Sequence, residues 1–180
     1  CKRLVKLGEE KFRIHNVGSP QLDELREKRY STIQEVKQRL GFDASRDFFL
    51  LVQHPVTEDY DQAASQIRET LDALNRFSQP KVVILPNNDA GSLLIRQGIE
   101  GYRDGEYYVF SNVKREDYLC LLRSAICLVG NSSSGLIEAP TFRVPAINLG
   151  RRQHGRMRAS NVIDEEFDSL KIQKDRKSTR

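Results

Sequence analysis

The sequence predicts an α/β domain, a Rossmann-like doubly wound parallel sheet with helices on both faces. Five short runs are continuously apolar rather than alternating with polar residues, which is typical of strands buried on both faces. The stretches between these runs repeat apolar residues every three or four positions, as amphipathic helices do. Strands that alternate with helices in this way form parallel sheets. The length of 180 residues suits one domain.

The first part of the chain is predicted to be helical and peripheral. Ser19 is expected to cap a helix that has Pro20 in its first turn, and a second helix over residues 31–40 is expected to end at Gly41. Residues 1–18 are interpreted as a segment between domains. The chain does not begin with Met and starts on a charged, helix-like stretch, so we expect it to be a piece of a longer protein.

The remaining elements alternate in order along residues 48–149. Length and apolar content predict each strand, and one apolar stripe predicts each helix. The strands are expected over 48–53, 81–86, 106–110, 125–130 and 144–149, and the helices over 59–77, 90–102, 115–124 and 132–141. Together, residues 19–164 are the predicted Rossmann-like domain. Beyond residue 164 the sequence is charged and aperiodic, so residues 165–180 are predicted to be a basic, disordered tail.

Charge and hydropathy exclude several classes of partner. The net charge is +4, and residues 171–180 account for all of it with five basic side chains and one acidic one. The basic character is therefore confined to the tail, and we expect no nucleic-acid partner. The longest apolar runs, 48–52 and 82–85, are far shorter than the ~20 residues that cross a bilayer, so we expect no membrane partner.

The three cysteines do not form a recognisable framework. No CxxC motif is present, and the three histidines lack the spacing of metal ligands, so no metal site is predicted. Cys120 and Cys127 lie among leucines and are expected to be buried thiols. This cysteine usage fits a reducing compartment, so a cytoplasmic location is expected.

Ligands of open parallel sheets bind at the carboxyl ends of the strands, and two loops there carry notable polar residues. His54 follows the first strand, where it is suited to meet a phosphate or to move a proton, or alternatively to cap the loop. Asn87, Asn88 and Asp89 follow the second strand. They favour a turn that caps the next helix, and they are also able to present an amide to a ligand.

The loop after the fourth predicted strand is the most specific feature. Residues 130–138 read Gly-Asn-Ser-Ser-Ser-Gly-Leu-Ile-Glu, so three hydroxyls open a helix. Free N–H groups at a helix start favour an anion, and Glu138 is placed to accept hydrogen bonds from a ribose diol. The alternative is a serine-capped helix with a solvent-exposed glutamate. The run is neither a Walker A loop nor GxGxxG, so no cofactor is predicted.

An arginine cluster follows the last predicted strand. Four arginines lie within residues 151–158. Arginine binds phosphate through two parallel hydrogen bonds, and the position beyond a strand end favours a ligand role for one of them. The alternative is an ordinary solvated loop.

These loops, taken in order, resemble one family. Gln53-His-Pro-Val-Thr57, Pro86-Asn-Asn-Asp-Ala-Gly91, the run 130–138, Ile147-Asn-Leu-Gly-Arg-Arg-Gln-His-Gly-Arg156 and Asn161-Val-Ile-Asp164 are similar to segments of UDP-N-acetylglucosamine 2-epimerases, in particular the hydrolysing branch. The resemblance covers about residues 15–164. It implies a glycosyltransferase-B-like protein of two Rossmann-like domains, of which this chain is the second, nucleotide-binding one.

The resemblance also implies roles for individual residues. Ser132 and Ser133 would hold the diphosphate of UDP or UDP-N-acetylglucosamine, and Glu138 the ribose hydroxyls. His54 would lie near the phosphates and the reacting sugar as the catalytic residue. The remaining substrate-binding residues would be Arg152 at the diphosphate or sugar, Asn87 in the cleft, and Val113, whose strand end would present backbone groups to uracil.

The implied reaction eliminates UDP and then adds water with inversion at C2, which gives N-acetylmannosamine for sialic acid synthesis. A UDP-linked diacetamido sugar is an equally suitable substrate by this resemblance. The full-length protein is expected to be a homo-oligomer, and the isolated piece to be inactive. A UDP-sugar glycosyltransferase domain of the same fold and a non-catalytic nucleotide-sugar-binding module remain the alternatives.

Overall fold

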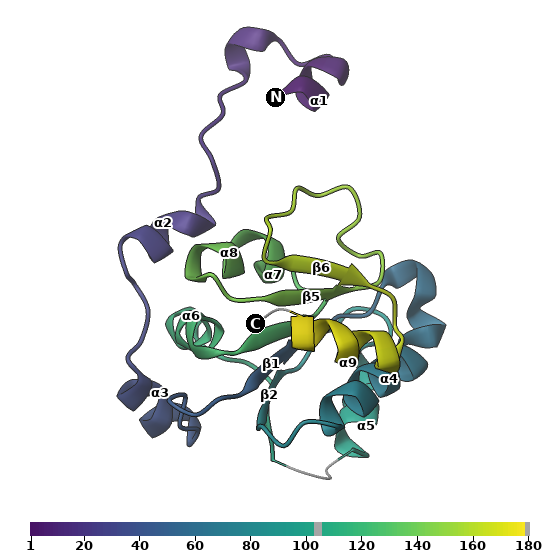
Figure 1. Ribbon diagram of the computed structural model, residues 1–180. Helices are drawn as coiled ribbons and strands as arrows, with labels where there is room; N and C mark the ends of the chain where they lie inside the picture. Colours follow the sequence, from purple (N-terminus) through teal and green to yellow (C-terminus); the bar gives the residue numbers. More distant parts are fainter. Residues whose placement is uncertain (103–105, 179–180) are drawn as a thin grey trace.

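The protein contains one parallel sheet, as seen in a computed structural model that describes residues 1–102 and 106–178 (Figure 1). The strand order is β3-β2-β1-β4-β5-β6, and every neighbouring pair is parallel. This is the order of a doubly wound dinucleotide-binding fold, so the predicted fold class is confirmed. The strands are β1 (Phe49–Val52), β2 (Lys81–Ile84), β3 (Tyr107–Phe110), β4 (Cys127–Gly130), β5 (Ala146–Leu149) and β6 (Val162–Glu165).

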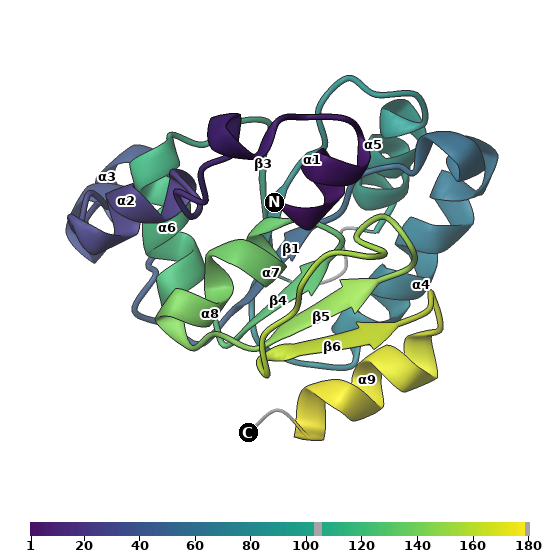
Figure 2. The same ribbon diagram turned by 90° about the horizontal axis from the view of Figure 1, so that it is seen from above.

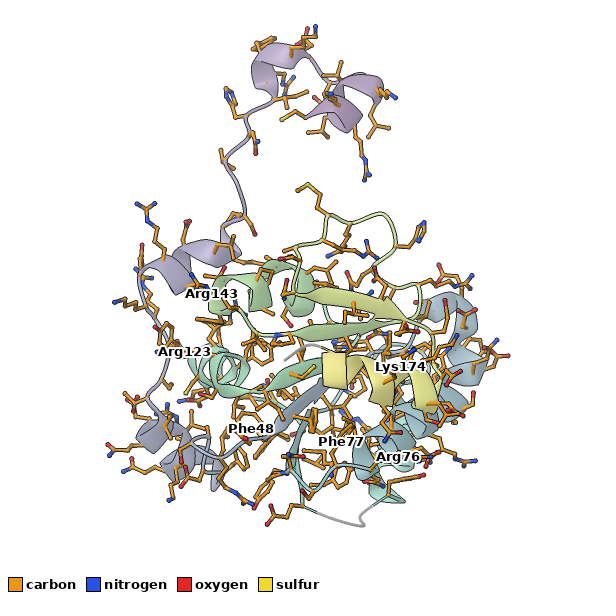
Figure 3. All side chains as sticks on the ribbon, in the orientation of Figure 1. Phe48, Arg76, Phe77, Arg123, Arg143 and Lys174 are labelled. Carbon is orange, nitrogen blue, oxygen red and sulfur yellow. The ribbon has the colours of Figure 1, made fainter. Side chains whose placement is uncertain are left out.

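Helices cover both faces of the sheet. Alternate residues of each strand point to opposite sides, and because both sets are apolar, each face is buried under helices. On one face α3 (Ile33–Leu40), α6 (Arg115–Ser124) and α8 (Ala139–Phe142) enclose a cluster that includes Phe48 and Leu50. On the other, α4 (Ala63–Asn75), α5 (Ser92–Glu100) and α9 (Ser169–Ser178) enclose Phe49 and Leu51, with Phe77 packed beside them. Figure 3 shows Phe48 and Phe77 inside the fold, whereas Arg76 points outward.

The amino-terminal segment projects from the domain (Figures 1 and 2). It contains α1 (Lys2–Lys6) and η1 (Lys11–Arg13), and it contacts the body through a 3.4 Å hydrogen bond from Arg3 Nη2 to the Gly155 carbonyl. Leu7, Phe12 and Val17 are each at least 75% exposed. Next comes α2 (Gln21–Arg26), which begins one residue later than expected and lacks the predicted Ser19 cap.

Two of the predicted helices are interrupted in the structure. The stretch 59–77 begins as a 3-10 helix, η2 (Thr57–Gln62), in which Asp59 leaves helical geometry and pairs with Arg151 before α4 starts. The stretch 132–141 is divided at Glu138 into α7 (Ser134–Ile137) and α8. Pro140 explains the break between α7 and α8, because proline has no N–H to continue the helix that precedes it.

The end of the chain differs from the predicted disordered tail. Glu165, the first residue of the predicted tail, ends the sixth strand, β6, and the helix α9 follows and packs against α4 with Ile172 only 2% exposed. The periodicity of this segment is weak, but Phe167 and Ile172 pack against the apolar cluster on the face of the sheet that α4 covers. Residues 179–180 of the predicted tail lie outside the described residues. No helix among the described residues has the length and apolar content to cross a bilayer.

An ion pair joins α3 and α6, which lie on the face of the sheet that carries Phe48 and Leu50 (the α3 face). Asp117 in α6 is 1% exposed, and Arg39 in α3 donates to it from Nη2 at 2.5 Å and from Nε at 3.0 Å. Arg39 also donates to the Ser31 hydroxyl at 2.6 Å. The hydrogen bonds from Arg39 lower the pKa of Asp117 below its ordinary value of 3.8. A carboxyl with a lowered folded-state pKa stabilises the fold above its unfolded pKa, and that contribution is lost as the pH falls.

Asp117→Asn is therefore expected to lower the free energy of unfolding by about 2 kcal/mol at pH 7, less than for a fully buried pair because Arg39 is partly exposed. The difference from wild type should shrink as the pH falls below about 4. Urea unfolding across this pH range measures it. Glu27→Gln, at an ion pair whose side chains are 70% and 50% exposed, should change stability by only a few tenths of a kcal/mol. An equal loss of unfolding free energy in the two variants would show that the pair of Arg39 with Asp117 stabilises the fold no more than an exposed ion pair does.

Candidate functional site

The predicted site loops meet at the point where the sheet changes winding direction. β1 and β4 are neighbours, and their crossover helices run to opposite faces, α4 after β1 and α7 with α8 after β4. The loops that follow two such strands separate and leave a crevice at the carboxyl edge of the sheet. His54 lies in the first loop, and Ser132 and Ser133 lie in the second, so the fold brings these three predicted residues to one place.

Asn131 fastens the two loops together. Its side-chain oxygen accepts a hydrogen bond from the His54 backbone N–H at 2.7 Å, and its amide donates to the His54 carbonyl at 2.8 Å. Asn131 is fully buried. Just before it, Gly130 has a φ of +128°, and a Cβ at that position would lie 2.2 Å from the Val52 carbonyl oxygen. The end of β4 therefore passes against the end of β1 at backbone distance.

The loop that carries the four arginines, residues 151–158 (the arginine loop), is also held to Asn131. The Asn131 carbonyl accepts hydrogen bonds from Gln153 Nε2 at 2.8 Å and from Arg152 Nη1 at 3.2 Å. Gln153 is 1% exposed, whereas Arg152 is exposed. Gln153 thus anchors the loop after β5, and Arg152 lies beside residues 131–134 after β4 (the serine loop), with donors available to a ligand. Arg151 serves a different purpose, since it binds Asp59 through two hydrogen bonds.

His54 is half-buried and lies between groups of both charges. Burial is the largest cause that lowers its pKa below 6.5, and the charge of Arg152 lowers it further. A hydrogen bond with Asn87 and the charge of Asp89 act in the opposite direction. The imidazole is consequently neutral at pH 7, and one of its nitrogens is able to accept a proton. Asn87 itself is exposed.

Glu138 lies beneath the serine loop rather than in an open cleft. It is 4% exposed, and its Oε1 accepts a hydrogen bond from Arg115 at the start of α6. Arg115 also donates from Nε to Glu24 of α2 at 2.9 Å. The sequence interpretations of Glu138, a ribose ligand or a solvent-exposed residue, both miss this ion pair. Among the described residues no partner is recorded for the second oxygen, Oε2.

Val113 follows the edge strand β3. It is half-buried in the loop after β3, and it packs against the apolar cluster of the α3 face. Arg115 follows two residues later and donates to Glu138, so this ion pair connects the loop after β3 with Glu138.

A hollow of about 400 Å³ adjoins the arginine loop. Loops after β1, β2 and β5 line it through Pro55, Val56, Thr57, Glu58, Asp89, Arg151 and Arg152. Its charged side chains are two acidic ones, Glu58 and Asp89, and two basic ones, Arg151 and Arg152. Within the described residues no three His, Cys, Asp or Glu side chains lie close enough together to hold a metal ion.

The comparison with family models decides the relationship. The family model described as UDP-N-acetylglucosamine 2-epimerase matches residues 1–179. The chain belongs to the UDP-N-acetylglucosamine 2-epimerase family. The resemblance inferred from the loop sequences is thereby confirmed.

Curated members of this family are similar to the chain along part of their length. It is 35% identical over 164 residues to a UDP-N,N'-diacetylbacillosamine 2-epimerase (hydrolyzing) of Legionella pneumophila, which covers 91% of this chain and 44% of that protein. It is 33% identical to a UDP-N-acetylglucosamine 2-epimerase of Neisseria meningitidis, over 94% of this chain and 45% of that one. The chain thus spans less than half the length of the curated relatives it matches.

Solved structures share the fold. A crystal structure of the UDP-GlcNAc 2-epimerase from Neisseria meningitidis bound to UDP-GlcNAc superimposes with a TM-score of 0.73 at 13% identity, covering 97% of this chain and 49% of that one. A UDP-N-acetylglucosamine 2-epimerase from Listeria monocytogenes gives a TM-score of 0.69 at 16% identity, over 97% and 46%. The chain therefore matches about half the length of each of these structures, which have a glycosyltransferase-B-like fold, as predicted.

Proposed function

We propose that this chain forms the nucleotide-binding half of a hydrolysing UDP-N-acetylglucosamine 2-epimerase. Family membership supports the class of enzyme. The observation that carries the proposal for the site is the contact of three strand-end loops at Asn131, which brings His54, the serine loop and Arg152 together. Segment 1–18, with its exposed apolar side chains, would connect this domain to the other half.

Each polar group of the site has a role that fits its position. Ser132 and Ser133 would donate to the diphosphate of UDP, and Arg152 would contribute a charge beside it. The free Oε2 of Glu138 would accept from the ribose diol while Arg115 holds Oε1. Val113 would lie at the uracil, and Asn87 would line the crevice. His54, neutral and next to Asn87, would face the phosphates and the reacting sugar.

The proposed reaction consumes one water. Removal of the C2 proton and departure of UDP from C1 give a 2-acetamidoglucal, and water then adds across the double bond with inversion at C2. The products are N-acetylmannosamine and UDP. We propose a cytoplasmic, homo-oligomeric enzyme of sialic acid synthesis, and the diacetylbacillosamine relatives favour a diacetamido sugar as a second candidate substrate.

The test uses the intact protein that carries this chain, with each UDP-sugar in D₂O and no acceptor. UDP release together with a free 2-epimerised sugar that carries one deuterium at C2 supports the proposal. Turnover that requires an acceptor would identify a glycosyltransferase instead. Binding of UDP with no turnover of either sugar would indicate a non-catalytic module.

Arg152→Met is expected to weaken UDP binding about tenfold, as the loss of one charge-assisted hydrogen bond at an exposed position. Uridine, which lacks the diphosphate, should bind equally well to both forms. Calorimetry with the two ligands measures this difference. Arg76→Met, at the outward-facing end of α4 (Figure 3), is the matched control and should leave both affinities unchanged. An equal loss for UDP and uridine would rule out a diphosphate role for Arg152.

A further inference from the structure

A chain of three hydroxyls runs from α6 into the serine loop. The Tyr118 hydroxyl forms a hydrogen bond with the Ser134 hydroxyl, and Ser134 Oγ lies 2.9 Å from Ser132 Oγ. Ser134 also donates its backbone N–H to Ser132 Oγ at 3.4 Å. Ser134 is 5% exposed, whereas Ser132 is half-buried at the crevice. The buried end of the chain is therefore tyrosine, and the accessible end is the serine proposed to meet the diphosphate.

The available donors and acceptors allow two directions for this chain, and only one of them leaves a proton at the crevice. Each hydroxyl has one proton to donate and two lone pairs to accept with. If Ser132 donated inward to Ser134, and Ser134 to Tyr118, the tyrosine proton would return to Ser132, which also forms a hydrogen bond with Tyr118, and no hydroxyl proton would be left for a ligand. If Tyr118 donates to Ser134, and Ser134 to Ser132, every inner proton is used.

When the chain donates outward in this way, Ser132 is able to act toward a ligand only as a hydrogen-bond donor. Its oxygen accepts from the hydroxyl and from the backbone N–H of Ser134, so both lone pairs are occupied and only its proton is free. Hydrogen bonds in such a chain also polarise one another and strengthen the last donor. Burial raises the pKa of Tyr118 to about 12, so the phenol keeps the proton that starts the chain.

We propose that Tyr118 is a positioning residue that, through Ser134, directs the Ser132 hydroxyl proton toward a phosphate oxygen of the bound nucleotide. The inference rests on the proposed function, since it requires a diphosphate at the serine loop. Tyr118 itself touches no ligand. It acts by setting which way Ser132 donates.

Tyr118→Phe removes only the hydroxyl and keeps the ring, which packs against the apolar cluster of the α3 face. In the intact protein we expect the affinity for UDP to fall about three- to tenfold, as for one hydrogen bond lost, with no change for uridine. The control is Tyr107→Phe in β3, which removes a half-buried hydroxyl that donates to Asn75 Oδ1 at 2.6 Å. It should bind both ligands as the wild type does.

A double-mutant cycle separates this role from general destabilisation. Tyr118→Phe should have no further effect on UDP affinity when Ser132 is already alanine, because the chain then has no end to direct. Ser134→Ala interrupts the same chain and should reproduce the loss, which keeps the test available if Tyr118→Phe folds poorly.

Three results have distinct meanings. A wild type that does not bind UDP would refute the proposed function, and the present inference with it. A wild type that binds UDP and is weakened by Ser132→Ala but unaffected by Tyr118→Phe and Ser134→Ala would overturn the inference alone. A loss of uridine affinity equal to that of UDP would also overturn it, since it would show a structural effect without preference for the diphosphate.

Discussion

Glu138→Ala is expected to weaken UDP binding about 100-fold in the intact protein, because the carboxylate would accept hydrogen bonds from two ribose hydroxyls at a buried position. The same change removes a partner of Arg115, whose side chain is 36% exposed and retains Glu24. We therefore expect a moderate loss of about 1–2 kcal/mol in the free energy of unfolding. Calorimetry with UDP and urea unfolding measure the two effects separately.

The ribose role predicts a particular ligand dependence. The wild type should bind UDP far more tightly than 2′,3′-dideoxyuridine diphosphate, and Glu138→Ala should bind the two alike. Glu24→Gln is the matched control, since it removes the other carboxylate from Arg115 and leaves Glu138 in place. It should keep the preference for UDP. An unchanged UDP affinity in Glu138→Ala would show that this buried carboxylate serves only the ion pair with Arg115.

The sheet and its site edge were predictable because local patterns encode them. Continuous apolar runs such as residues 48–52 and 125–130 predict strands buried on both faces, and the structure has β1 and β4 there. Parallel sheets bind ligands at the carboxyl ends of their strands, so the polar run after residue 130 could be recognised as a candidate site loop. The arrangement of the loops then follows from the strand order, which the alternation of elements suggests.

Contacts between distant positions could not be predicted in this way. Asn131 bonds to His54 across 77 residues, and Gln153 bonds to Asn131 across 22. In the sequence Asn131 is one polar residue among serines, and Gln153 is one uncharged residue among arginines, so neither differs from an ordinary loop residue. Arg115 and Tyr118 read as parts of a helix, and only the folded structure shows that they reach Glu138 and Ser134.

The carboxyl-terminal helix was missed for a related reason. Residues 169–178 contain few apolar side chains, and they lack the regular stripe from which a helix is predicted. Their order in the structure comes from packing against α4, with Ile172 buried, and from the Ser169 N–H that Glu69 accepts at 3.0 Å. Tertiary contacts rather than local propensity stabilise this element.

Gly130→Ala is expected to be the most destabilising single change at the site, with a loss of more than about 4 kcal/mol in the free energy of unfolding. Gly130 has a φ of +128°, which side chains rarely adopt, and the added Cβ would lie 2.2 Å from the Val52 carbonyl oxygen and 2.6 Å from its carbon. Both atoms belong to β1, so relief requires that β1 and β4 separate and that Asn131 lose its bonds to His54. Urea unfolding of the intact protein measures the loss.

Gly155→Ala separates backbone conformation from steric overlap. Gly155 has a φ of +74°, also in the region that favours glycine, but nothing lies within 4 Å of the position its Cβ would take. The cost there should be only the conformational one, about 1 kcal/mol. The difference between the two variants then reports how tightly the ends of β1 and β4 are packed. A Gly130→Ala protein as stable as Gly155→Ala would mean that the two strand ends can move apart freely, and the fixed placement of His54 beside the serine loop would be wrong.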